Sequence, residues 1–288
     1  MSIEALFATP VALPAVPKVV QQLIQSFSRE DVAVEEIAAA LETDPVLTAK
    51  TLRLANSAYF HVSRRIASVD DALRMLGFAM VRNLVIGCGV VGAFKAVPGL
   101  DLPTFTRHSL HTASAARWLA ASGGHNADLA FTVGLLHSIG HLVMHLAMPE
   151  ETRRLNHDCR PLAAERAVLE RSRFGYHHGE VGTELARRWR FPDEVALPLA
   201  RVPDPLSGKP PCTTASLIHI AAWRARVHGS TIDADRAHET FPSAVAHAID
   251  LQVAWLPELR TIGGRHPAAS APMPPLDELS NGLQEMMA

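Results

Sequence analysis

Apolar residues recur at helical spacing along most of this 288-residue chain, and no stretch keeps the period-two alternation of a β-strand. Hydrophobic residues make up 48% of the chain but aromatic residues only 6%, which favours helices over a β-sandwich and still allows a sizeable core. One early apolar helical face consists of Val16, Val19, Val20, Leu23, Ile24 and Phe27. We therefore expect an all-α protein.

Capping residues and prolines divide this pattern into separate helices. Asp44 and Pro45 supply an N-cap and a proline at the first helical position. The run from Val81 to Phe94 is apolar nearly all round, so we expect a buried helix that packs closely at Gly87, Gly89 and Gly92. Pro98-Gly99 then breaks the pattern. The sequence predicts two packed helical bundles, over residues 10–100 and 101–260, and a flexible tail rich in Pro, Gly, Ser and Ala at 261–288.

Histidines gather in the second part, where nine of the fifteen lie between His108 and His178. A single helix capped by Asn126 is expected to carry His137, with His141 and His145 on the same face one and two turns later. His108 and His178 belong to two other expected helices. Three imidazoles, those of His108, His137 and His178, could therefore converge on a metal ion, as ligands from separate helices do in helical bundles.

A hydrolytic metal centre would also need carboxylates, which neutralise the cation and orient its bound water. Ser138 stands directly after His137, where an aspartate would be wanted. Two interpretations of the histidines stay open. They could form a divalent metal site, or they could be buried side chains with hydrogen-bond partners, and we favour the second interpretation.

Charge and cysteine content limit the classes of partner and compartment. The formal net charge of -2 provides no field that attracts nucleic acid or acidic membranes. No signal peptide is visible in residues 1–10, and the longest apolar run is too short to span a bilayer. The cysteines form no CxxC pair and indicate a reducing compartment; they are Cys88, Cys159 and Cys212. We expect a cytoplasmic protein without membrane contact.

Seven segments, in this order, resemble the HDOD domain family: Leu13–Pro17, Asp44–Thr48, Leu52–Phe60, Ala72–Gly77, Arg107–Leu110, Gly134–Gly140 and His178–Leu185. The resemblance extends over about residues 10 to 225. HDOD domains are all-helical bacterial signalling modules that are related to the HD and HD-GYP phosphohydrolases and are usually regarded as non-catalytic. The resemblance implies the same fold here, with a degenerate HD-like bundle over residues 101–260.

The resemblance also assigns positions to the HD pattern. His108 resembles its first histidine, His137 the histidine of its His-Asp doublet, and His178 the next histidine. The remaining ligand positions have lost their side chains: Ser138 replaces the aspartate of the doublet, Val202-Pro203 replaces a His-His pair, and Ala222 replaces the final aspartate. The resemblance thus implies a vestigial metal site at His108, His137 and His178, no catalytic residue and no cofactor.

We predict a non-catalytic signal-transduction module, an HDOD output domain of a response-regulator pathway. Its expected partners are other signalling proteins, with a homodimer left open and nucleic acid not expected. One alternative is a metal-dependent phosphodiesterase that uses a divalent metal held by the same three histidines with a carboxylate such as Glu180 or Glu184. A second alternative is a DNA-binding regulator, because residues 37–56 could form a helix-turn-helix that offers Lys50 and Arg53.

Overall fold

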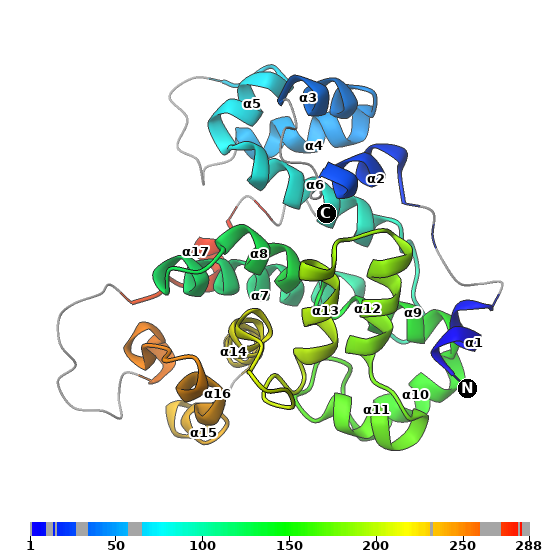
Figure 1. Ribbon diagram of the computed structural model, residues 1–288, viewed down its shortest axis with the longest axis vertical. Helices are drawn as coiled ribbons and strands as arrows, with labels where there is room; N and C mark the ends of the chain where they lie inside the picture. The colour runs from blue at the N-terminus through cyan, green and yellow to red at the C-terminus, as the bar shows by residue number, and fades with distance from the viewer. Residues whose placement is uncertain are drawn as a thin grey trace.

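The computed structural model describes residues 2–9, 14, 16–26, 34–56, 65–230, 233–259, 272–281 and 283. Within these ranges the regular structure is α-helix with short 3-10 turns, and no strand occurs (Figure 1). The all-α prediction is confirmed. Parts of two segments that carry the family resemblance, Leu13–Pro17 and Leu52–Phe60, lie outside the described residues, as does Phe27.

The first part of the chain forms α1 (Ile3–Phe7), α2 (Lys18–Gln25), α3 (Val34–Glu42), α4 (Pro45–Ala55), α5 (Val69–Leu76) and α6 (Phe78–Gly92). The predicted start of α4 is confirmed, because the Asp44 carboxylate accepts hydrogen bonds from the backbone N–H groups of Val46 and Leu47 at 2.9 and 3.1 Å. Helix α1 packs apart from the other five, against the later helix α9 (Figure 1). DNA binding through residues 37–56 stays a prediction.

Helix α6 joins the two parts of the chain through its glycines. A side chain at Gly87 would lie 2.0 Å from Leu135, and one at Gly89 would lie 2.3 Å from Val20, so close packing is confirmed at both. Gly92 meets nothing within 4 Å, so that part of the prediction is wrong. Because one hydrophobic cluster extends on both sides of residue 100, the division into two domains stays a prediction.

The second part contains the helices that position the site. They are α7 (Leu102–Ser122), α8 (Ala127–Leu136), α9 (Ile139–Ala147), α10 (Pro149–Asp158), α11 (Arg166–Phe174), α12 (His178–Arg188), α13 (Asp193–Arg201) and α14 (Thr213–His228). Helix α7 packs against α8 and α14, while α12 packs against α9 and α13.

The helix expected to continue through His137 is interrupted there, so that prediction is wrong. Nδ1 of His137 lies 2.6 Å from the carbonyl oxygen of Gly134, which in a regular helix would accept from the N–H of residue 138. Ser138 takes the non-helical angles φ -103° and ψ 4°. The imidazole therefore replaces a backbone donor, and the turn at 137–138 separates α8 from α9.

The end of the chain also differs from expectation. The helix expected over 241–256 is divided into α16 (Ser243–Ala248) and the 3-10 turn η3 (Val253–Trp255), since Asp250 adopts a positive φ of 50°. Helix α15 (Ala234–Glu239) precedes them and a second 3-10 turn, η4 (Pro257–Leu259), follows. The segment expected to be a loose tail includes α17 (Leu276–Leu279), which packs against α7 (Figure 1).

The most apolar stretch of the chain belongs to the protein core. Residues 127–147 are long and apolar enough to cross a membrane by composition, but 89% of that apolar window is buried inside the protein. Helices α5 and α6 pass the same test only as a pair bent by 112°. Packing of the core explains both features, and the cytoplasmic location stays a prediction.

Candidate functional site

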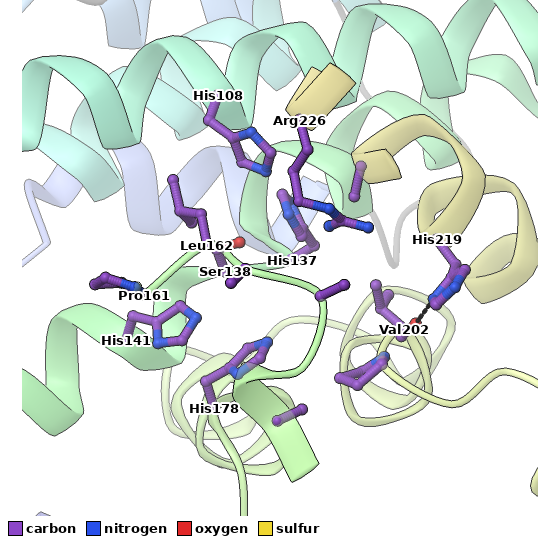
Figure 2. A pocket seen from close by; sticks show the side chains of 15 residues that line it. His108, His137, Ser138, His141, Pro161, Leu162, His178, Val202, His219 and Arg226 are labelled. Atoms are coloured by element: carbon purple, nitrogen blue, oxygen red, sulfur yellow. Dashed lines mark hydrogen bonds between the residues drawn. The ribbon is translucent and has the colours of Figure 1, made fainter. Parts of the chain in front are cut away.

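A cavity of about 50 Å³ lies where α7 and α14 face the α8–α9 turn and the start of α12 (Figure 2). Since a water molecule needs on the order of 10–15 Å³ of such space, the cavity has room for a few waters or one small group. Its polar lining includes five histidines and one arginine: His108, His137, His141, His178, His219 and Arg226.

All three histidines of the predicted metal site line this one cavity. The ring centroids of His108 and His137 are 5.7 Å apart. The ring of His178 instead stacks on His141, with 3.9 Å between centroids. Among the described residues, the ligand atoms that come within 4.8 Å of one another here belong to His141, Glu170 and His178. Metal binding by His108, His137 and His178 stays a prediction.

A glycine brings the two stacked rings together. A side chain at Gly140 would lie 1.9 Å from the carbonyl oxygen of His178 and 2.8 Å from the N–H nitrogen of Gly182. Only glycine at this position lets α9 approach the first turn of α12 so closely. His141, the next residue on α9, consequently meets the ring of His178.

Three of the cavity histidines are held by an acceptor at Nδ1. That nitrogen lies 2.6 Å from the Gly134 carbonyl in His137, 2.8 Å from the Val202 carbonyl in His219, and 2.7 Å from Glu170 Oε2 in His178. Because carbonyl and carboxylate oxygens only accept, each Nδ1 must carry the proton. In the neutral ring, Nε2 then keeps its lone pair, the tautomer that metal-binding histidines also adopt.

Three of the cavity histidines are neutral at physiological pH, whereas Arg226 is charged. Burial lowers the pKa of both His137 and His141 to about 3, and it holds the pKa of His108 well below its usual value. Burial also lowers the pKa of Arg226 to about 10, which leaves the guanidinium cationic. Figure 2 shows Arg226 beside His108 and His137. The fixed charge among the residues lining the cavity is therefore positive.

Glu170 of α11 is fully buried behind the cavity, and both of its oxygens are engaged. Oε1 lies 2.9 Å from Arg166 Nε and 3.3 Å from His141 Nδ1. Oε2 accepts from the backbone N–H and the Nδ1 of His178 at 2.8 and 2.7 Å. Burial alone would raise the pKa of Glu170, but His178 and His141 outweigh it and hold the pKa far below its usual range. The ionised carboxylate thus orients both rings.

Sequence reasoning missed Glu170 and named two other glutamates. Glu180 pairs with Arg171, and Glu184 pairs with Arg188, each at 2.8 Å on the surface of the protein. Neither lines the cavity. The available signal was an arginine four residues before Glu170, since such i,i+4 partners share one helix face.

The residues present do not fit a hydrolytic divalent metal centre. No aspartate or glutamate occurs among the described residues that line the cavity. The positions expected to supply ligands hold Ser138, Pro203 and Ala222, and all three line it. Ala222 stands at the position of the final aspartate of the HD pattern. Arg226 lies one helical turn later and adds a cation to the same lining. A divalent ion would gain no neutralising charge from this lining and would be repelled by the guanidinium.

Comparisons with known proteins agree with this fold. The model of the HDOD domain family matches residues 13–205. The chain resembles the crystal structure of a Shewanella amazonensis protein named "Putative phosphohydrolase", with 27% identity, 96% and 95% of the two chains covered, and a TM-score of 0.74. It also resembles an HDOD domain protein of unknown function from Geobacter sulfurreducens, with 27% identity, 82% and 83% coverage, and a TM-score of 0.66.

A curated relative, an uncharacterized protein of Treponema pallidum, is 28% identical over 191 residues. The match covers 64% of this chain and 36% of the relative. The chain therefore spans little more than a third of the length of that protein.

Proposed function

Because the chain belongs to the HDOD domain family, we propose that it is a non-catalytic signal-transduction module that acts through contacts with other signalling proteins. The observation that carries this proposal is the chemistry of the cavity lining. His108, His137 and His141 are neutral, the guanidinium of Arg226 is charged, and no described lining residue is acidic. Hydrolysis of a phosphodiester by a metal-bound water instead requires carboxylates that neutralise the metal ion and orient the water.

The interactions behind the cavity support a structural role for its histidines. His137 closes the α8–α9 turn through the Gly134 carbonyl, and His178 fixes the start of α12 on Glu170. Each ring holds one helix end in place. In this proposal the histidines keep the helices in register, and the outer faces of the helices meet the partner.

The alternative is a metal-dependent phosphohydrolase, which the name of the Shewanella relative favours. For this chain, that reaction would need a carboxylate beside His137. Glu170 is the nearest candidate by its contacts, but all its short contacts are already made to Arg166, His141 and His178. Recruiting it would leave the buried Arg166 without its countercharge.

Metal affinity tests the proposal. We expect the wild-type cavity to bind Mn²⁺ weakly, and we expect at least tenfold tighter binding after Ser138→Asp and Ala222→Asp are combined with Arg226→Ala. The measurement is calorimetric titration of the purified full chain after chelation. The proposal is contradicted if wild-type protein binds one equivalent of Mn²⁺ tightly, a result that needs no variant to fold.

A further inference from the structure

Away from the cavity, two histidines and an aspartate meet at the C-terminal segment. His111 of α7, His228 at the end of α14, and Asp277 of α17 come together from three elements that are distant in the sequence. Nε2 of His228 lies 3.1 Å from Asp277 Oδ2, and Nε2 of His111 lies 3.5 Å from Asp277 Oδ1. The two rings are 5.1 Å apart between centroids.

Packing holds the aspartate at this position. Leu276, its neighbour in α17, is fully buried. Arg224 donates to the carbonyl oxygen of Pro274 at 3.0 Å, and the N–H of Met273 donates to the carbonyl oxygen of Trp255 at 2.8 Å. These contacts fix the segment before Asp277, so the carboxylate faces the two imidazoles without needing a ligand to place it.

The spacing of the ligand atoms matches that of a tetrahedral zinc site. Zinc binds histidine nitrogen at about 2.0–2.1 Å and carboxylate oxygen at about 2.0–2.2 Å, so neighbouring ligands of a tetrahedron lie about 3.3–3.5 Å apart. The distances of 3.1 Å from His228 to Oδ2 and 3.5 Å from His111 to Oδ1 lie close to this range, and one ligand atom from each of the three residues lies within 4.8 Å of the others. The longer distance exceeds the 2.7–3.2 Å range of ordinary N–H···O hydrogen bonds.

Two imidazoles with one carboxylate are also the ligand types that zinc prefers, and hard ions such as Mg²⁺ prefer oxygen alone. The Asp277 side chain is 72% exposed, so an ion can enter from solvent and keep a water as its fourth ligand. His111 is buried, which anchors the site to the core of α7.

We propose that His111, His228 and Asp277 form a Zn²⁺ site that fastens the C-terminal segment 272–281 to α7 and α14. The inference is independent of the function proposed for the cavity, because the two sites share no residue. A bound ion would join α17 to α7 and α14 across a sequence separation of 49 between His228 and Asp277. Zinc availability then controls how firmly this segment is docked.

Hydrogen exchange with mass spectrometry tests the site on the full chain, first chelated and then titrated with ZnCl₂. We expect zinc to slow amide exchange at least tenfold in peptides that cover residues 273–280. Asp277→Asn and His228→Gln should each weaken zinc binding by more than about 100-fold, because loss of a residue that only hydrogen-bonds to a metal ligand already costs about 10–100-fold. Co²⁺ should give the visible absorption of a tetrahedral site in wild-type protein and lose it in both variants.

Two control variants separate this site from other histidines. His157→Gln changes an exposed histidine of α10, and His238→Gln changes an exposed histidine of α15. Both variants should keep the zinc-dependent protection of the segment. Neither substituted side chain is buried, since that of Asp277 is 72% and that of His228 28% exposed, so the metal-free variants should melt close to the wild type. The proposal is overturned if zinc leaves exchange in 273–280 unchanged, or if Asp277→Asn and His228→Gln bind zinc as tightly as the wild type.

Discussion

Replacing Glu170 with glutamine removes a fully buried negative charge while nearly preserving the shape of the side chain. The Arg166 guanidinium, also fully buried, then loses the carboxylate that lies 2.9 Å from its Nε. The amide NH₂ of the new glutamine must also face a donor, because Arg166 Nε, the His178 N–H and the His178 Nδ1 all donate to Glu170. Breaking a buried pair in this way costs about 3–5 kcal/mol.

The Arg166 guanidinium keeps two other acceptors in the variant, so we expect a loss of unfolding free energy near the lower end of that range. Arg166 Nη1 keeps its hydrogen bonds to Asn156 Oδ1 and to the Cys159 carbonyl. We therefore expect Glu170→Gln to lower the free energy of unfolding by about 3 kcal/mol.

Urea unfolding followed by circular dichroism and by fluorescence measures this loss, and coincident transitions justify the two-state treatment. Glu35→Gln is the control, because it removes an exposed glutamate of α3 and should change stability by no more than about 0.5 kcal/mol. A Glu170→Gln variant within about 1 kcal/mol of the wild type would refute the reasoning that this carboxylate holds the site together.

Two further predictions concern the same region. The unfolding free energy should fall as the pH drops from 6.5 to 5, because His137 and His141 have folded-state pKa values of about 3, so the unfolded chain binds more protons in this window. The loss is up to about 2 kcal/mol for each histidine, and a pH-independent stability measured by urea titration would contradict it. Gly140→Ala should destabilise the protein by about 1–3 kcal/mol, since the new methyl group meets the backbone of α12. Gly92→Ala, where nothing lies within 4 Å, should be neutral or slightly stabilising, and equal melting temperatures for the two variants would count against this packing.

The helical class and several helix ends were predictable because their causes are local. Asp44 and Ser68 each accept a backbone N–H of the helix that follows, at 2.9 and 3.1 Å. The interruption at His137 was not predictable in this way. It depends on a side chain that replaces a backbone donor, and helical periodicity continues on both sides of it.

The sequence predicted the histidines of the candidate site, but it did not predict its charged residues, Glu170 and Arg226. His108, His137 and His178 stood out by residue type, and they do line one cavity. Arg166, four residues before Glu170, was the local signal for a buried ion pair. The placement of Glu170 behind the histidines, and of Arg226 among them, arises from the packing of α11 and α14 around the other helices. The sequence places Arg226 one helical turn after Ala222 and so on the same face of the helix, but only the structure shows that this face lines the cavity.

The central claim, that this cavity does not support metal-dependent hydrolysis, is tested most directly by turnover. The assay compares wild-type protein and His137→Ala on a phosphodiester, with Mn²⁺, Fe²⁺ or Zn²⁺ supplied after chelation. We predict the same rate for both proteins, equal to that of the metal alone. Metal-dependent turnover by the wild type that is lost in His137→Ala would contradict the claim and identify the chain as a hydrolase.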